Sequence, residues 1–248
     1  MSLNTVDSKP TPSTAEVEPV APEKVSEDSS PGELIEWMLR RFAGQRVVMT
    51  TAFGMEGCAL IDMIAERTNR FKVVYIDTDF FFPETLALRD RLTERYPHVD
   101  VVRHGTTLTP KAQAERFGSE LWKRDPDLCC RIRKMDPMRE VMQDVDVWVT
   151  GLRRSQSATR ASVRAVMWDW QHEVLKISPL ASWDRATVWQ YVQAHHVPYN
   201  PLHERGYPSV GCTHCTRAVK GAAVDSYSRE GRWNGRPKLE CGLHGEGI

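Results

Sequence analysis

The sequence VVMTTAFGMEG at residues 47–57 joins a short apolar run to a turn that contains glycine. Val47, Val48 and Met49 predict a buried strand, because β-branched and apolar side chains suit the interior of a sheet. After the turn, Leu60 and the apolar residues that follow it recur at helical spacing, which predicts a helix. The stretch therefore predicts a strand that is followed directly by a helix.

The same order of strand and helix recurs along the chain. Further strands are expected at residues 73–76, 99–102, 145–149 and 174–177, and further helices at residues 34–42, 83–96 and 183–195. This alternation predicts an α/β fold in which a mostly parallel sheet has helices on both faces. Ligands of such sheets bind beyond the carboxyl ends of the strands. Three polar loops are expected there, at residues 50–57, 77–79 and 151–154.

The composition narrows the classes of protein to consider. Lysine plus arginine and aspartate plus glutamate both number 33, so net charge gives no reason to expect nucleic acid or a membrane as partner. The chain shows no apolar run long enough to span a bilayer, and its first residues lack the order of a secretory signal. We therefore expect a cytoplasmic protein. In that reducing compartment the six cysteines are expected to be ligands or nucleophiles rather than disulfides.

The first two polar loops suit a nucleotide, although each has a plainer interpretation. The turn at Gly54 leads into a helix, so its backbone N–H groups can face an anion, but glycine also serves there for packing alone. The turn matches neither the Walker loop nor the dinucleotide fingerprint. Asp77 follows a strand and suits either a ribose hydroxyl or a helix cap. Both interpretations stay open.

The third polar loop is basic and contains Arg153, Arg154 and Arg160 among serine and threonine residues. One interpretation is a solvated charged loop. The other is a clamp for phosphate or sulfate, because a guanidinium group can donate two parallel hydrogen bonds to such oxyanions. The position directly after a strand favours the clamp.

Four of the cysteines form two local pairs, Cys129-Cys130 and Cys212 with Cys215. Adjacent cysteines form a disulfide only with backbone strain. Four thiols in two pairs suit an iron–sulfur cluster or a structural zinc ion. Because structural zinc usually takes its ligands from two Cys-x-x-Cys pairs, the adjacent pair favours the cluster, and zinc stays open.

The other two cysteines differ from these pairs and from each other. Cys58 lies in an apolar helical stretch and is expected to be a small buried residue. Cys241 lies near the end of the chain, between Glu240 and Gly242. A cysteine in such a segment can move between a substrate and a protein reductant.

Five segments resemble the assimilatory adenylyl-sulfate reductases. They are Cys129-Cys130, residues 199–202, residues 206–212, residues 215–219 and the sequence ECGLH at residues 240–244. The resemblance runs from about Thr50 to His244. It implies an adenine nucleotide α-hydrolase-like (Rossmann-like) fold and reduction of adenosine 5′-phosphosulfate to sulfite and AMP. Thioredoxin or glutaredoxin would be the electron donor, as a separate protein, because no thioredoxin-like domain follows before Ile248.

The resemblance also implies one 4Fe-4S cluster and a set of residue roles. Cys129, Cys130, Cys212 and Cys215 would hold the cluster. Cys241 would be the nucleophile that forms an S-sulfocysteine intermediate, Lys134 would orient the sulfate, and His244 would stabilise the thiolate or the leaving phosphate. Residues expected to bind the substrate are Phe53, Gly54, Glu56, Asp77, Arg153, Arg154, Arg229 and Arg232.

Three parts of the chain are expected. Residues 1–31 are rich in Pro, Ser, Thr, Glu and Lys and are expected to be a disordered tail. Residues 32–227 would form the nucleotide-binding reductase domain with the iron–sulfur site. Residues 228–248 would form a mobile segment that carries Cys241. A homo-oligomer is compatible with the sequence.

Two departures from the reductase pattern leave alternatives open. Asp79 stands where the family usually has glycine, and the spacing before Arg229 and Arg232 differs from the usual one. One alternative is a reductase of the 3′-phosphorylated nucleotide, or of both nucleotides. Another is a redox sensor that holds an iron–sulfur cluster or zinc, in which Cys241 would be dispensable.

Overall fold

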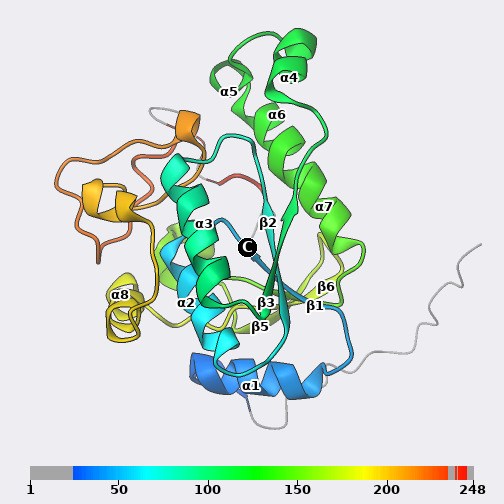
Figure 1. The fold of residues 1–248 in the computed structure, drawn as a ribbon, viewed down its shortest axis with the longest axis vertical. Helices are drawn as coiled ribbons and strands as arrows, with labels where there is room; N and C mark the ends of the chain where they lie inside the picture. Colours follow the sequence, from blue (N-terminus) through cyan, green and yellow to red (C-terminus); the bar gives the residue numbers. More distant parts are fainter. Residues whose placement is uncertain (1–24, 234–237, 239, 245–248) are drawn as a thin grey trace, which may run out of the picture.

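A computed structural model describes residues 25–233, 238 and 240–244 of the chain. Among these residues, a six-stranded sheet has the strand order β3-β2-β1-β4-β6-β5 (Figure 1). Its strands are β1 (Val47–Thr51), β2 (Phe71–Ile76), β3 (Val99–His104), β4 (Val147–Val149), β5 (Val166–Asp169) and β6 (Val174–Ile177). All neighbouring strands run parallel except β5 and β6. The predicted α/β fold with a mostly parallel sheet is confirmed.

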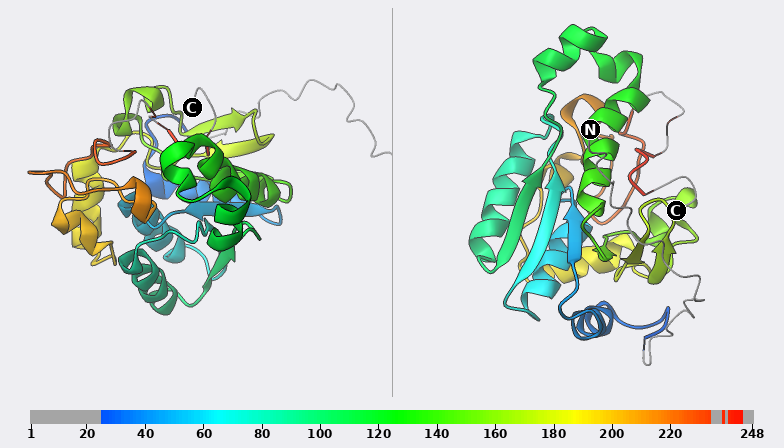
Figure 2. Two further views of the ribbon diagram at one scale, coloured as in Figure 1. Left: turned by 90° about the horizontal axis from the view of Figure 1, so that it is seen from above. Right: turned by 90° about the vertical axis from the view of Figure 1, so that its right-hand side faces the viewer.

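Helices cover both faces of this sheet (Figure 2). They are α1 (Pro31–Arg41), α2 (Met55–Ala65), α3 (Pro83–Arg95), α4 (Pro110–Phe117), α5 (Leu121–Arg124), α6 (Pro126–Cys130), α7 (Asp136–Met142) and α8 (Arg185–Ala194). A π-helical turn at Arg131–Met135 joins α6 to α7. The larger core packs α1, α2, α3 and α8 on one face, and the smaller core packs α7 on the other.

The strand order determines where a ligand can bind. From β1 the chain adds β2 and β3 on one side and later β4 on the other. Met49 pairs with Val73 of β2 and with Val149 of β4, so the three strands end at the same edge of the sheet. In open α/β sheets the ligand binds at this edge, where the strand order reverses.

The turn between β1 and α2 is tightly packed, and this explains its sequence. A Cβ atom on Gly57 would lie 2.2 Å from the Thr51 Oγ1 atom, so this position requires glycine. Phe53 takes a left-handed conformation with φ of 56°, and its ring is buried against Tyr75. Gly54 is the N-cap residue of α2, and no side chain caps this helix. No N-cap side chain therefore occupies the backbone donors in the first turn of α2.

The start of the described chain is anchored to the domain. The Ser30 hydroxyl accepts a hydrogen bond from the Glu33 N–H and caps α1. The Glu27 carboxylate accepts hydrogen bonds from Arg154 at 3.0 Å and Arg164 at 3.1 Å. Most of the predicted tail, residues 1–24, lies outside the described residues. No helix within residues 25–233 is both long and apolar enough to cross a membrane.

Candidate active site

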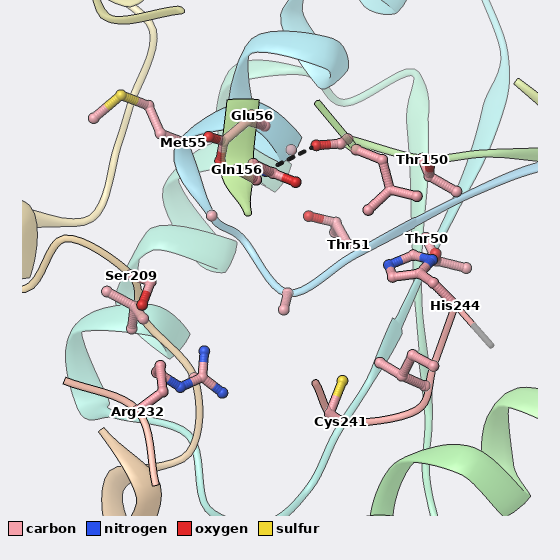
Figure 3. Close-up of a pocket in the computed structure, with 18 of the residues that line it drawn as sticks. Thr50, Thr51, Met55, Glu56, Thr150, Gln156, Ser209, Arg232, Cys241 and His244 are labelled. Atoms are coloured by element: carbon pink, nitrogen blue, oxygen red, sulfur yellow. Dashed lines mark hydrogen bonds between the residues drawn. The ribbon is translucent and has the colours of Figure 1, made fainter. Parts of the chain in front are cut away.

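A cleft opens at the carboxyl ends of β1, β2 and β4 (Figure 3). Thr50 and Thr51 end β1 at its floor, and Thr150 and Gly151 follow β4 beside them. Gly54 to Gly57, at the start of α2, form another part of the wall. The cleft therefore lies where the strand order predicts a ligand.

Segments from the last fifth of the chain close the cleft. These segments are residues 208–212, residues 227–232 and residues 241–244. Figure 3 shows the Cys241 thiol pointing into the cavity, with the Arg232 guanidinium on one side and the His244 imidazole on the other. Seven of the residues that the sequence predicted for the site thus line one cleft. They are Cys241, His244, Lys134, Arg229, Arg232, Gly54 and Glu56.

The cleft is cationic and has unpartnered polar atoms. Among the described residues that line it, five are lysine or arginine and Glu56 is the only one with a carboxylate. The five cationic residues are Lys134, Arg160, Arg185, Arg229 and Arg232. Buried polar atoms without a hydrogen-bond partner also lie on its lining residues: Arg185 Nη2, His203 Nε2, Ser209 Oγ, Arg229 Nε, Arg232 Nε and His244 Nδ1. Because buried polar groups are normally paired, this set indicates a site for a polar, anionic ligand.

Two further features favour an anion. The N-terminus of α2 lines the cleft, and helix N-termini attract anions through their free N–H groups and dipole. The guanidinium groups of Arg229 and Arg232 lie 5.2 Å and 4.8 Å from the centre of the Trp233 ring. This buried indole holds both cations beside each other.

Glu56 and Arg153 pair with each other in the interior. The Glu56 Oε1 atom accepts hydrogen bonds from Arg153 Nε at 3.0 Å and Nη2 at 2.8 Å, and from Arg185 Nη1 at 3.2 Å. Burial raises the pKa of Glu56, but the charges of Arg185 and Arg153 outweigh it and bring the pKa to about 2. Arg153 is fully buried and lies outside the cleft lining. Its expected role as an oxyanion clamp is not supported by this geometry.

Three other predicted substrate residues also lie outside the cleft lining. Arg154 donates to Glu27 and to the Val163 carbonyl. The Phe53 ring is in the core. The Asp77 carboxylate accepts a hydrogen bond from Arg103 Nε at 2.7 Å, which favours a structural role for that side chain. In the basic loop it is Arg160 that reaches the cleft.

The structure also accounts for Asp79 at the usual glycine position. Asp79 has a φ of 57°, the left-handed conformation that glycine adopts most easily. Its carboxylate pairs with Arg133 at 2.7 Å and Arg103 at 3.2 Å. The added negative charge is therefore compensated outside the cleft lining.

The two cysteine pairs line one small cavity next to the cleft. Cys129 and Cys130 end α6, Cys212 precedes a single turn of 3-10 helix, and Cys215 is the last residue of that turn. Phe80, Trp122 and His214 form an aromatic part of the wall, with Trp122 stacked on His214 at 3.8 Å between ring centres. Lys134 and Cys212 line both this cysteine cavity and the cleft. The two cavities therefore share a wall.

The spacing of the thiols distinguishes between kinds of metal site. Among the described residues, three donor atoms within 4.8 Å of one another occur only at Asp62, Glu66 and His195, so no three cysteine sulfurs are that close. Around one tetrahedral zinc ion, thiolate sulfurs lie about 3.8 Å apart. Burial and the neighbouring thiols raise the pKa of Cys129 to about 11, a repulsion that bound metal would relieve. The donor set fits a cluster of several metal ions better than one zinc ion.

Cys241 differs electrostatically from those four thiols. Burial raises its pKa, but Lys134, a backbone hydrogen bond from Leu243, Arg232 and Arg229 outweigh burial and lower the pKa below the ordinary thiol value. The thiolate is the nucleophilic form of cysteine. Cys241 is therefore activated where the cleft is most cationic.

His244 is held flat against the smaller core. Its imidazole stacks on Trp148 with 5.1 Å between ring centres and an angle of 13°. Burial and the positive charges of Arg160 and Lys176 hold the pKa of His244 well below its usual value. At neutral pH the ring is uncharged and offers an unpartnered Nδ1 atom.

Comparison with known proteins identifies the family. The profile described as "Phosphoadenosine phosphosulfate reductase domain" matches residues 46–218. The chain belongs to this reductase family. A protein of Salinibacter ruber named adenosine 5′-phosphosulfate reductase is 45% identical over 218 residues, which are 88% of this chain and 85% of the relative. A protein of the same name from Halalkalibacterium halodurans is 42% identical over 212 residues, 86% of this chain and 90% of that one.

Solved structures support the reductase fold. The phosphoadenylyl-sulfate (PAPS) reductase of Candida auris, in a phosphate complex, matches with a TM-score of 0.66 and 29% identity over 77% of this chain and 91% of that one. The FMN adenylyltransferase of Candida glabrata matches with a TM-score of 0.53 over 81% of this chain and 71% of that one. At 14% identity, the second likeness shows the fold alone.

Sequence reasoning misses several residues of this reductase cleft. Arg185 opens α8 and lines the cleft, yet it lies in an ordinary helical pattern, and its partner Glu56 is 129 positions away. His203 and Ser209 lie within or beside segments that resemble the family, which is the only signal that marks them. Arg160 is visible in the basic loop, but nothing in the sequence separates it from Arg153 and Arg154.

Proposed function

We propose that this protein reduces adenosine 5′-phosphosulfate to sulfite and AMP in cytoplasmic sulfate assimilation. The observation that carries the proposal is the Cys241 thiol, whose pKa is lowered, in a cleft with five cationic side chains. The names of the relatives at 40 to 45% identity support this nucleotide as the substrate.

In the proposed reaction, the Cys241 thiolate attacks the sulfur of the sulfonate group. The bond between that sulfur and the bridging oxygen breaks, AMP leaves with the electron pair, and an S-sulfocysteine forms. A thiolate of thioredoxin or glutaredoxin then attacks the Cys241 sulfur, so that sulfite leaves and a mixed disulfide forms. The second thiol of the donor resolves that disulfide. The two electrons come from the dithiol.

The cleft residues stabilise the charges of this reaction. Arg229 and Arg232 have unpartnered Nε atoms, which suits the phosphosulfate oxygens. Lys134 is close enough to lower the pKa of Cys241, which supports its proposed role in orienting the sulfate. The neutral His244 ring can accept or donate a hydrogen bond, but it carries no charge to stabilise an anion at neutral pH.

We also propose that Cys129, Cys130, Cys212 and Cys215 hold one 4Fe-4S cluster. The support is that the four thiols line one cavity and that two of them are adjacent in sequence. When bound, the cluster would supply electrostatic and structural support to the neighbouring cleft through their common wall. The Cys241 chemistry requires no change in its oxidation state.

Adduct formation tests the proposal and its alternatives. Enzyme is incubated with adenosine 5′-phosphosulfate or with the 3′-phosphorylated nucleotide, and the mass of the peptide that carries Cys241 is measured. We expect a sulfonated Cys241 with the unphosphorylated nucleotide, no adduct in Cys241→Ser, and sulfite release when thioredoxin is added. An adduct formed only with the 3′-phosphorylated nucleotide would assign the alternative substrate. No adduct with either nucleotide would disprove the reductase and favour the redox sensor.

A further inference from the structure

The residue before Cys241 is held by two arginines of the cleft. The Glu240 Oε1 atom accepts a hydrogen bond from Arg160 Nε at 3.0 Å, and Oε2 accepts one from Arg160 Nη2 at 2.8 Å. This is the paired geometry that makes arginine–carboxylate contacts strong. Arg229 Nη2 lies 3.2 Å from Oε2. We call Glu240, Arg160 and Arg229 the Glu240 cluster.

The Glu240 cluster is built into its surroundings. The third nitrogen of the Arg160 guanidinium, Nη1, donates to Gln156 Oε1 at 2.5 Å, so each of its three nitrogens has a partner within the protein. Thr159 and Ser157 hydroxyls lie 3.2 Å and 3.5 Å from Glu240 Oε1. The side chains of Arg160 and Glu240 are only 8% and 16% exposed. A pair this buried is screened little by solvent.

A second anchor lies just beyond Cys241. Leu243 packs against the smaller core, and Gly242 has a φ of 85°. A Cβ atom on Gly242 would lie 2.7 Å from the Met135 Sδ atom, so the backbone passes close to the turn that carries Lys134. Cys241 therefore lies between a polar anchor and an apolar anchor.

We propose that Glu240 is a positioning residue, which fixes the Cys241 thiol in the cleft through its ion pair with Arg160. Arg229 connects this anchor to the substrate, because its Nη2 contacts Glu240 while its Nε has no partner. The assignment rests on the proposed function for its catalytic consequence, but the anchoring itself does not.

The anchoring is tested without nucleotide. The full-length protein is treated with a bulky maleimide, and labelling of the Cys241 peptide is followed by mass spectrometry. We expect Glu240→Gln and Arg160→Gln to label roughly tenfold faster than wild type, because a broken buried ion pair releases the segment. Glu230→Gln is the matched control, since Glu230 is exposed and its side chain has no ion pair with Arg160. Equal rates in wild type and Glu240→Gln would overturn the proposal.

The catalytic consequence is tested by a single turnover with adenosine 5′-phosphosulfate. Glu240→Gln is expected to form the adduct roughly tenfold more slowly while AMP binds with unchanged affinity, since the residue acts through the position of Cys241. Glu240→Asp should recover part of the rate. The double variant Glu240→Gln/Arg160→Gln should be no slower than the slower single variant, because both remove one interaction. A parallel loss of AMP affinity in Glu240→Gln, or additive losses, would contradict the assignment.

These two experiments separate the two proposals. If wild type forms no adduct, the proposed function fails, and the labelling experiment still decides whether Glu240 anchors the segment. If wild type forms the adduct and Glu240→Gln matches it in both labelling and rate, only the positioning role fails. If Arg160→Gln is the only variant that unfolds at a lower temperature, the comparison of Glu240→Gln with Glu230→Gln still decides whether Glu240 positions Cys241.

Discussion

Individual arginines of the basic loop have different tasks, although the sequence presents them as equivalents. Arg153 is fully buried on Glu56, Arg154 holds Glu27, and Arg160 holds Glu240. The cations left for a ligand are those with unpartnered atoms, Arg229 and Arg232 among them. At this scale, the donors that remain without a partner after ion pairing decide which arginine can bind substrate.

Replacing Arg153 is expected to affect stability before it affects binding. In Arg153→Met, the buried Glu56 carboxylate keeps only Arg185, and the free energy of unfolding should fall by about 3 kcal/mol. Arg154→Met should cost less than about 1 kcal/mol, because its ion pair is one-third exposed. Urea denaturation measures both. If the Arg153→Met protein had wild-type stability but no longer bound AMP, the interpretation of Arg153 as an oxyanion clamp would be supported instead.

The reactivity of Cys241 should depend on pH through its neighbours. Because Lys134, Arg232 and Arg229 lower the pKa of the thiol, the rate of Cys241 alkylation should rise with pH through a midpoint below 9.0, its ordinary value. Removing one cation in Lys134→Met raises that pKa, so the midpoint should move to higher pH. Lys111→Met, an exposed lysine outside the cleft lining, is the control. A midpoint that stays in place in Lys134→Met would exclude this role for Lys134.

At the scale of elements, the turn from β1 into α2 depends on Gly57 rather than on Gly54. Gly54 has a φ of −67°, and a Cβ atom there would meet nothing closer than 3.7 Å. Gly57 has no such space, because Thr51 lies against it. The sequence draws attention to Gly54, because it lies in the turn before the helix. The packing in the structure shows instead that position 57 requires glycine.

Alanine substitutions test this distinction. Gly57→Ala is expected to cost about 1–3 kcal/mol of unfolding free energy, because overpacking displaces the end of β1, and to weaken AMP binding. Gly54→Ala should fold normally. Adding Thr51→Ala to Gly57→Ala should recover part of the loss, since the closest atom is the Thr51 hydroxyl. Thermal unfolding and AMP titration give both readouts, and equal stability of the two single variants would refute the packing argument.

The sequence predicts elements well where burial is periodic and poorly elsewhere. All five expected strands form because their β-branched residues are buried in the sheet. Strand β5 is missed because Trp168 is 44% exposed, and the turn to β6 uses Glu173 in a left-handed conformation instead of a glycine. The short helices α4 to α6 leave no periodic pattern. The two cysteine pairs and Cys241 are predicted from motifs, but partners such as Glu56 and Arg185 meet only through tertiary packing.

At the scale of the whole molecule, the cysteine cavity joins distant parts of the chain. Cys129 and Cys130 come from α6, whereas Cys212 and Cys215 come from a loop that also pairs Cys212 with Phe81. A metal group held by all four would cross-link these parts, so metal binding should add to folding stability.

Loss of one ligand should therefore be visible without any activity measurement. Cys212→Ser is expected to lose the brown colour and the iron of the purified protein and to unfold at a lower temperature than wild type. Cys58→Ser, at a buried cysteine outside the cysteine cavity, should keep its iron. A colourless wild-type protein with one equivalent of zinc would refute the cluster.

The grip on Glu240 has a consequence for the pace of the catalytic cycle. A folded donor protein needs room around the sulfur atom that it attacks, whereas the nucleotide needs that atom deep among the cations. In the proposed reaction, the Cys241 sulfur would therefore have to occupy two different positions in every cycle. A stronger ion pair at Glu240 would speed the attack of Cys241 on the nucleotide and delay the attack of the donor thiolate on Cys241. Turnover should therefore be fastest when this ion pair has intermediate strength.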